Sequence, residues 1–351
     1  VTFTISTQGV TSGTTLYYSI DGSVSSSDFT DNAITGSFSI QSNSASVTKT
    51  LLEDGTTEGN ESFVFKIHTG STTGPVVYSS STVTVYDTSK TVYIGTYKFK
   101  SARSYTSGAW TVPANTTYIQ VVAWGSGGEP DGYPNGFPGG SGGGGGWATA
   151  VIPVTAGESL DVGVGRDGNN GGGGKSFGGT GGGFSGVFRG STPLIIAGGG
   201  GGGAVNNTAQ GGAGGGYSGQ GSSDGYSGGS QSGASNRYLQ GGTGGGGGYY
   251  GGNGNSWSNA AGGGSGYIGA SGNIHASMST GSWTSPAGTG HADYDSSHSP
   301  MGRPYGQGGS GNNSGDSSYG SGLLVIHCLN SEYNPSSAPV FPSTRNIIQT
   351  Y

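Results

Sequence analysis

The chain has 351 residues, of which 81 are glycine, while 30% are hydrophobic and only 9% are charged. Ordinary enzyme domains do not have this balance. A collagen-type triple helix is excluded, because glycine comes in runs such as 142–146 and 198–203 instead of at every third position. The net charge of −6 and the single cysteine, Cys328, argue against nucleic-acid binding and a disulfide framework.

Apolar and polar residues alternate in short segments over residues 1–90. Phe3 and Ile5, or Phe63 and Phe65, are typical pairs, and clusters of Gly, Asn, Asp and Ser separate the segments. Alternation with period two predicts antiparallel strands. Since about 90 residues is the size of one immunoglobulin-like domain, we predict an antiparallel β-sandwich over 1–90. A linker or connecting strand is expected over 91–106.

Four carboxylates fall within nine positions just before Phe63: Glu53, Asp54, Glu58 and Glu61. Their mutual repulsion is unfavourable unless a cation or solvent screens it. Calcium takes six to eight oxygen ligands, often from flexible carboxylate loops. The sequence therefore leaves two interpretations open, a Ca²⁺ site and a solvated acidic loop.

The paired acids followed by Glu58-Gly59-Asn60-Glu61 and an aromatic strand resemble the Calx-β domain. The resemblance extends to Asp28 and to Asp87 at the end of the last strand. It implies a Calx-β-like sandwich over 1–90 with Ca²⁺ as its cofactor, held by Asp28, Glu53, Asp54, Glu58, Glu61 and Asp87. Thr88 departs from the family's usual pair of adjacent aspartates.

Glycine dominates the second part of the chain, where 71 of the 81 glycines lie between Gly125 and Gly322. Apolar strands adjoin the glycine runs, at 118–124, 147–154, 160–164, 193–197 and 323–328. A flexible linker would not carry such strands. Polyglycine forms left-handed threefold helices without internal hydrogen bonds, and only glycine lets such backbones approach and bond one another. We therefore predict an ordered domain of packed polyglycine II helices with β-strands.

Several motifs over 107–328 resemble the glycine-rich domain at the ends of many bacteriophage tail fibres. They include Val121-Val122-Ala123-Trp124-Gly125, Ile195-Ile196-Ala197-Gly198 and Gly322-Leu323-Leu324-Val325-Ile326. The resemblance implies a sandwich of polyglycine helices whose tip loops touch the receptor of the host. Joined to a Calx-β-like module, such a domain looks most like a fibre protein of a phage of marine bacteria.

Aromatic and histidine side chains between the glycine runs are the candidate receptor contacts. Tyrosine and tryptophan offer large contact areas at low entropic cost, although the same rings could instead pack against the glycine tracts. The candidates are Tyr133, Phe137, Tyr226, Tyr238, Tyr249, Tyr250, Trp257, His275, Trp283, His291, Tyr294, His298 and Tyr305. They fall in the glycine-poor loops 129–138, 217–239, 249–261 and 274–305. We expect removal of the longest, 274–305, to abolish cell binding while leaving folding intact, because long loops on rigid scaffolds often carry function.

Enzymatic activity has little support in the sequence. No serine or cysteine stands in a recognisable arrangement with a base, and His327 and Cys328 lie in an apolar strand pattern. His291, Asp293, Asp295 and His298 could bind a divalent metal, or could serve only solubility. We therefore expect no catalytic residues and no cofactor beyond calcium.

The sequence thus predicts a non-enzymatic, extracellular adhesin of a virion tail fibre. Its expected partners are a glycan or outer-membrane protein of a bacterial surface, other fibre or virion proteins, and further copies of itself. Nucleic acid and membrane insertion are not expected, since no apolar run approaches the roughly 20 residues of a spanning helix. The alternative is a structural subunit of a bacterial surface filament. The tail 329–351 is expected to be extended, either as a docking strand or as a cover for the scaffold.

Overall fold

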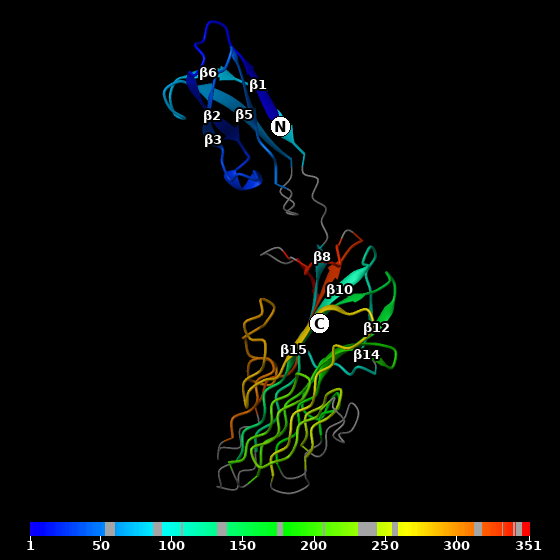
Figure 1. Ribbon diagram of the computed structural model, residues 1–351. Coiled ribbons are helices and arrows are strands. Elements are labelled where there is room, and N and C mark those ends of the chain that lie inside the picture. Colours follow the sequence, from blue (N-terminus) through cyan, green and yellow to red (C-terminus); the bar gives the residue numbers. More distant parts are fainter. Residues whose placement is uncertain are drawn as a thin grey trace. The chain divides into compact units, whose positions relative to one another are not determined.

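The computed structural model describes residues 1–52, 60–86, 93–106, 108–131, 139–173, 178–205, 208–230, 244–254, 259–311, 318–331, 333–339, 341 and 346–351. It divides into two compact units, Val1–Thr91 and Val92–Tyr351 (Figure 1). Within these residues the regular structure is β-strand, apart from the short 3-10 helix η1 (Ser26–Asp28). None of the described helices is long and apolar enough to cross a membrane.

The first unit is built from two antiparallel sheets. One sheet pairs β1 (Thr2–Ser6) with β4 (Ser44–Thr48). The other runs β3 (Thr35–Ser39), β2 (Thr15–Gly22), β5 (Glu61–His68) and β6 (Val76–Ser79), with β7 (Val83–Val85) also paired to β5. Phe3 of β1 stacks on Phe65 of β5 at 4.2 Å between ring centroids. The predicted antiparallel β-fold of this region is therefore confirmed.

A second sandwich forms the first part of the glycine-rich unit. Its six-stranded sheet has the order β15-β11-β10-β16-β8-β17, and its four-stranded sheet has the order β14-β13-β12-β9. The six strands are β15 (Ile274–Ser279), β11 (Trp147–Pro153), β10 (Tyr118–Trp124), β16 (Leu323–Leu329), β8 (Tyr93–Phe99) and β17 (Ile347–Thr350). The four strands are β14 (Thr192–Ala197), β13 (Ser185–Arg189), β12 (Ser159–Gly163) and β9 (Ala109–Thr111).

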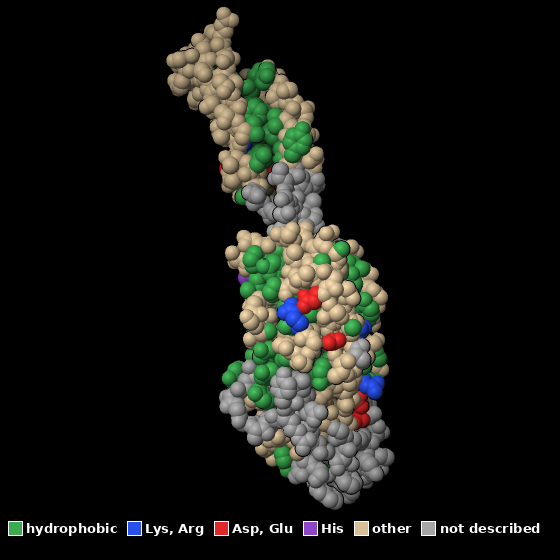
Figure 2. Space-filling view, turned by 90° about the vertical axis from the view of Figure 1, so that its right-hand side faces the viewer, with side chains coloured by type: hydrophobic (Ala, Val, Ile, Leu, Met, Phe, Trp, Pro, Cys, Tyr) green, Lys and Arg blue, Asp and Glu red, His purple; other side chains and the backbone are tan. Residues whose placement is uncertain are grey.

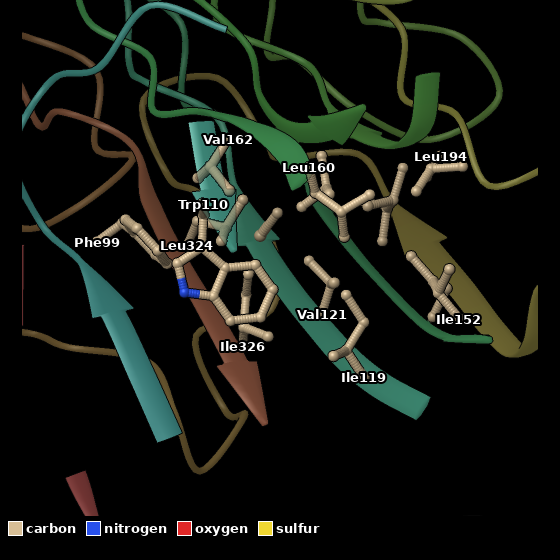
Figure 3. Packing of buried hydrophobic residues seen from close by; sticks show 14 of the residues in the cluster. Phe99, Trp110, Ile119, Val121, Ile152, Leu160, Val162, Leu194, Leu324 and Ile326 are labelled. Atoms are coloured by element: carbon tan, nitrogen blue, oxygen red, sulfur yellow. The ribbon is translucent and has the colours of Figure 1, made fainter. Parts of the chain in front are cut away.

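The main hydrophobic core lies between these two sheets. Side chains of β10, β11 and β16 point toward side chains of β9, β12 and the 194–197 part of β14 (Figure 3). Ile119, Val121, Leu160 and Ile326 are fully buried. Burial of such side chains contributes about 1.5–3 kcal/mol each, so the sandwich supplies the hydrophobic stabilisation that glycine cannot.

Several strands continue directly into glycine tracts, which run side by side beyond the sandwich (Figure 1). The seven central tracts form what we call the glycine bundle: 125–131, 139–146, 178–184, 198–205, 208–216, 244–248 and 259–266. Backbone hydrogen bonds connect the tracts, although the residues lie outside regular strands. The bundle is therefore an ordered, hydrogen-bonded structure.

Hydrogen-bond partners of tract 198–205 repeat every third residue. Gly199 and Gly202 donate to tract 244–248, Gly200 and Gly203 to 125–131, and Gly201 and Ala204 to 208–216, over N···O distances of 2.7–3.2 Å. Its carbonyl groups accept hydrogen bonds with the same period of three. Residues 198 and 201 accept from tract 139–146, residues 199 and 202 accept from tract 259–266, and residues 200 and 203 accept from tract 178–184. The central tract is thus bonded to six neighbours. A period of three is what threefold polyglycine helices require, while their helical geometry itself stays a prediction.

Glycine is required here because the tracts lie in direct backbone contact. A Cβ added at Gly200 would lie 2.0 Å from the carbonyl oxygen of Gly143, and one at Gly199 would lie 2.1 Å from that of Gly182. Any other residue at these positions would push the tracts apart. Because glycine has no side chain, the tracts come close enough for the backbone hydrogen bonds that hold the bundle together.

Three segments that the sequence set apart from the glycine-rich domain or treated as a loop carry strands of the six-stranded sheet. Segment 91–106 contains β8, which lies between β16 and β17 within the six-stranded sheet. In the tail 329–351, β17 pairs in parallel with β8. Segment 274–305 begins with an edge strand, β15, which pairs with β11. All three belong to the glycine-rich unit, because their backbones complete its sheet.

Candidate binding surface

One end of the glycine bundle gathers the ends of several tracts. Asp131 N–H donates to the Gly140 carbonyl at 3.1 Å, Gly140 N–H donates to Ala204 at 2.8 Å, and Ala204 N–H donates to Ala209 at 3.2 Å. We call these four residues, with Gly311, the tip end. Gly311 belongs to it because its N–H donates to the Ser141 hydroxyl at 3.0 Å. Asp131, Gly140, Ala204 and Ala209 thus bring four tract ends together at the tip end.

Tyr226 is the predicted contact residue that the structure describes near the tip end. It follows Gly225, whose positive φ of 98° closes a turn, and the N–H of Ser223 in that turn donates to Gln210, beside Ala209. The Tyr226 hydroxyl accepts a hydrogen bond from the Asn259 amide at 2.8 Å. The ring is half-buried, so one part of it is anchored while another part faces solvent.

Four other candidates lie outside the described residues: Tyr133, Phe137, Tyr238 and Trp257. Tyr133 and Phe137 belong to connection 132–138, which follows Asp131 of the tip end in the chain. Their role in receptor contact stays a prediction.

Tyr249 and Tyr250 lie at the opposite end of the bundle, next to the sandwich. Tyr249 stacks on Tyr267 at 4.2 Å between centroids and packs against the buried cluster of Phe184, Phe188 and Ile196. Burial raises the pKa of the Tyr249 hydroxyl. This position corresponds to the alternative that the sequence left open, in which an aromatic ring packs against the scaffold.

The segment after β15 covers the outer face of the six-stranded sheet. Tyr305 is only 3% exposed and joins a cluster with Val122, Trp124 and Leu323. The Tyr294 hydroxyl donates to the Tyr305 carbonyl at 3.1 Å. Tyr305 is therefore a core residue, and its prediction as a receptor contact was wrong, because the sheet leaves no room for a partner.

His291 and Tyr294 also face this sheet. The His291 ring lies 5.9 Å from the ring of Trp124 and 5.7 Å from that of Trp147, and the Tyr294 ring lies 5.7 Å from Trp124. Removal of 274–305 would uncover this buried surface. We therefore expect the deletion to destabilise the glycine-rich unit, in contrast to the expectation from the sequence.

Trp283, His275 and His298 are more exposed and lie away from the tip end. Trp283 is 38% exposed in a turn with φ of 44°, and its backbone N–H donates to the Gln220 side chain at 3.1 Å. His275 lies on edge strand β15, where Nε2 is 3.0 Å from the Pro335 carbonyl. His298 is exposed in the segment that follows. These residues do not form one cluster with Tyr226.

A buried polar chain crosses from the segment 280–305 into the sheet. Asp293 Oδ2 lies 2.7 Å from His327 Nε2, and His327 Nδ1 lies 2.7 Å from the Thr96 hydroxyl. Asp293 is 2% exposed, while His327 and Thr96 are fully buried. Although the order of groups resembles a carboxylate–imidazole–hydroxyl triad, a substrate could not reach the hydroxyl. These hydrogen bonds instead fasten segment 280–305 to the six-stranded sheet.

The sequence analysis did not predict this contact, because it interpreted His327 as part of an apolar strand. The available signal was a histidine within the apolar run of β16, since a buried imidazole needs hydrogen-bond partners from elsewhere in the chain. His291 Nδ1 lies 3.6 Å from the Asp293 carboxylate. In the part of the chain that the structure describes, no group of three or more His, Cys, Asp or Glu side chains could hold a metal ion.

Two of the six predicted calcium ligands, Asp28 and Glu61, are described. Asp28 accepts at its backbone carbonyl from Leu52 N–H at 2.8 Å, which brings it to the start of the acidic segment. Glu61 pairs with Val85, two residues before Asp87. Glu53, Asp54, Glu58 and Asp87 lie outside the described residues.

The fold and this surface define a glycine-rich all-β protein, in which a sandwich carries a bundle of bonded glycine tracts. The chain matches the glycine-rich domain family over residues 100–326 and belongs to that family. No curated protein is significantly similar to it.

Proposed function

We propose that the chain is a non-enzymatic receptor-binding adhesin, carried at the end of a phage tail fibre, outside the cell. Its target would be a glycan or an outer-membrane protein of a bacterial surface. The tip end of the bundle would present the contact residues, with Tyr226 and the connections that carry Tyr133, Phe137, Tyr238 and Trp257. The finer fold, with polyglycine II helices and a Calx-β-like first unit, is part of this proposal.

The observation that carries the proposal is the six-neighbour bonding of tract 198–205. A scaffold that is fixed by backbone hydrogen bonds on all sides loses little entropy when a partner binds to its end. Reversible attachment needs no covalent chemistry. Charged residues make up only 9% of the chain, which also suits recognition of neutral groups. On the face of the glycine-rich unit shown in Figure 2, the charged side chains lie in a few separate places.

The test is binding of the purified, fluorescently labelled chain to a panel of marine bacteria. One variant replaces residues 132–138 with a Gly/Ser sequence of equal length. We expect this variant to bind the strains that the wild type recognises at least tenfold more weakly, with an unchanged unfolding temperature. The matched control is Ser191→Ala in the 190–191 turn of the sandwich, which should bind as the wild type does. Equal binding by the replacement variant would remove connection 132–138 from the contact surface.

The second candidate is a subunit of a bacterial surface filament. Strand β6 favours it, since Val76, Val77 and Tyr78 are 50%, 57% and 58% exposed on the edge of their sheet. Exposed apolar edge strands are templates for pairing with another chain. Light scattering of the concentrated protein distinguishes the two functions, since a filament subunit would polymerise and an adhesin would stay a monomer or small oligomer.

We also propose that the first unit binds Ca²⁺ through Asp28, Glu53, Asp54, Glu58, Glu61 and Asp87. Support comes from the backbone contact between Asp28 and Leu52 and from the pairing of Glu61 with Val85. Added Ca²⁺ should raise the unfolding temperature of the first unit, and Glu58→Gln should remove the effect. Asp21→Asn, at an ion pair with Lys66, is the control and should preserve it.

A further inference from the structure

An open groove runs along one side of the sandwich in the glycine-rich unit. It encloses about 780 Å³ and is lined by β9, the 112–114 and 156–157 segments, Tyr97 of β8, Gln349 of β17 and Tyr351. Strands β9 and β17 are edge strands of the two facing sheets. The groove therefore opens where the sandwich is not closed by further strands, and its volume falls within the roughly 300–1,000 Å³ of small-ligand sites.

Aromatic rings in the groove are held in fixed positions. The ring of Tyr351 stacks on Phe99 at 4.5 Å with an interplanar angle of 4°, and the Arg103 guanidinium lies 5.6 Å from the Tyr351 centroid and 5.7 Å from the Phe99 centroid. Tyr97 meets Trp110 edge to face at 5.3 Å. Trp110 packs among Phe99, Leu324 and Ile326 (Figure 3). Because these rings are already held in place, they lose little conformational entropy when a ligand binds.

Four polar side-chain groups in the groove have no hydrogen-bond partner among the residues that the structure describes. They are the indole N–H of Trp110, the hydroxyls of Tyr97 and Thr111, and the amide of Gln349. Trp110 is only 4% exposed, yet its indole N–H is not one of the buried side-chain atoms that lack a partner. The N–H therefore reaches solvent in the groove and is available to a ligand. Burial raises the pKa of Tyr97, so its hydroxyl stays protonated and can donate.

The lining side chains carry no charge. Phosphates, carboxylates and sulfated polymers would therefore find no cation among the lining side chains, and the guanidinium of Arg103 beside the groove already donates to the Ala109 carbonyl at 2.6 Å. A ligand that combines apolar C–H faces for the aromatic rings with many neutral hydroxyls for the polar groups fits both features. Neutral sugars have this combination.

We propose that this groove is a binding site for a neutral oligosaccharide, separate from the tip end of the bundle. The tyrosine rings pack against the sugar faces, while Trp110, Thr111 and Gln349 hydrogen-bond its hydroxyls. The site would give the chain a second sugar contact, on the flank of the sandwich. It does not depend on the proposed role of the tip end.

The test is calorimetric titration of the full chain with maltohexaose, laminarihexaose and fully N-acetylated chitohexaose. We expect at least one of these sugars to bind and to shift the Trp110 indole N–H resonance. Thr111→Val and Gln349→Ala remove one polar group each from exposed positions and should each weaken binding about fivefold. Thr192→Val, on β14, and Gln8→Ala, in the first unit, are the matched controls and should bind as the wild type does.

The tip variant with residues 132–138 replaced should bind the same sugar with unchanged affinity, which separates this proposal from the proposed function. Failure of all three sugars to bind would overturn it. Unchanged affinity in Thr111→Val and Gln349→Ala would do so too, as would a groove that binds only a strand-forming peptide. Unfolding temperatures of the variants within about 2 °C of the wild type exclude a folding defect as the cause.

Discussion

Substitution of one central glycine should destabilise the whole glycine-rich unit. Gly200→Ala places a methyl group 2.0 Å from the Gly143 carbonyl oxygen, where an ordinary contact needs at least 3.4 Å. The two tracts must therefore separate by about 1.4 Å, the difference of these two distances. Both tracts are bonded on other sides, so the movement cannot remain local.

The cost follows from the contacts of Gly200. Its N–H donates to Ser126 at 2.9 Å, and its carbonyl accepts from Gly182 at 2.8 Å. Two backbone hydrogen bonds contribute about 1 kcal/mol each, and overpacking a close-packed interior costs about 1–3 kcal/mol more. We therefore expect the free energy of unfolding to fall by about 3–5 kcal/mol. In a unit of this size the unfolding temperature should fall by roughly 6–20 °C.

The assay is calorimetric and denaturant-induced unfolding of the full chain, in which the two units are followed separately. The matched control is Gly290→Ala, because a Cβ at this exposed glycine would meet no atom within 4 Å. Its stability should stay within about 0.5 kcal/mol of the wild type. Equal stability of the Gly200→Ala and Gly290→Ala proteins would refute the close packing of the bundle.

Three further predictions concern titratable side chains. Burial raises the pKa of Cys328 to about 12, so a thiol reagent at pH 8 should leave the folded protein unmodified and label it only in denaturant. Burial alone would raise the pKa of Asp295, but hydrogen bonds from Lys100 and Ser297 lower it to about 2. The stabilisation is then present above the unfolded pKa of about 4 and lost as the pH falls to about 2; Asp295→Asn should be less stable than the wild type at pH 7 in urea titrations and equal to it at pH 2. Asp293→Ala leaves buried His327 without its carboxylate partner and should cost about 2–4 kcal/mol, measured by the same titrations, whereas exposed Asp224→Ala should cost much less.

Strands with strong apolar patterns could be predicted from the sequence. The expected 147–154 and 323–328 strands are β11 and β16 within one residue at each end. Period two and β-branched residues are local signals, so a single sequence carries them. The bonded glycine tracts were also predictable, because strands placed between glycine runs argue against a flexible linker.

Strand β15 could not be predicted in the same way. Its sequence, with His275, Ser277 and Ser279, has weak strand propensity, and it becomes a strand because β11 offers a free edge. The buried positions of Tyr305 and Asp293 depend on the same docking of 280–305 against the sheet. Such contacts join residues that are far apart in the chain, and aromatic composition alone does not distinguish an exposed ring from a buried one.

Hydrogen–deuterium exchange of the glycine amides tests the central claim most directly. If each tract is bonded to its neighbours, amides such as those of Gly199, Gly201 and Gly202 should exchange as slowly as amides of β10 and β16. Exposed glycines such as Gly290 should exchange rapidly in the same sample. Rapid exchange throughout 198–205, with protection confined to the sandwich strands, would contradict the account.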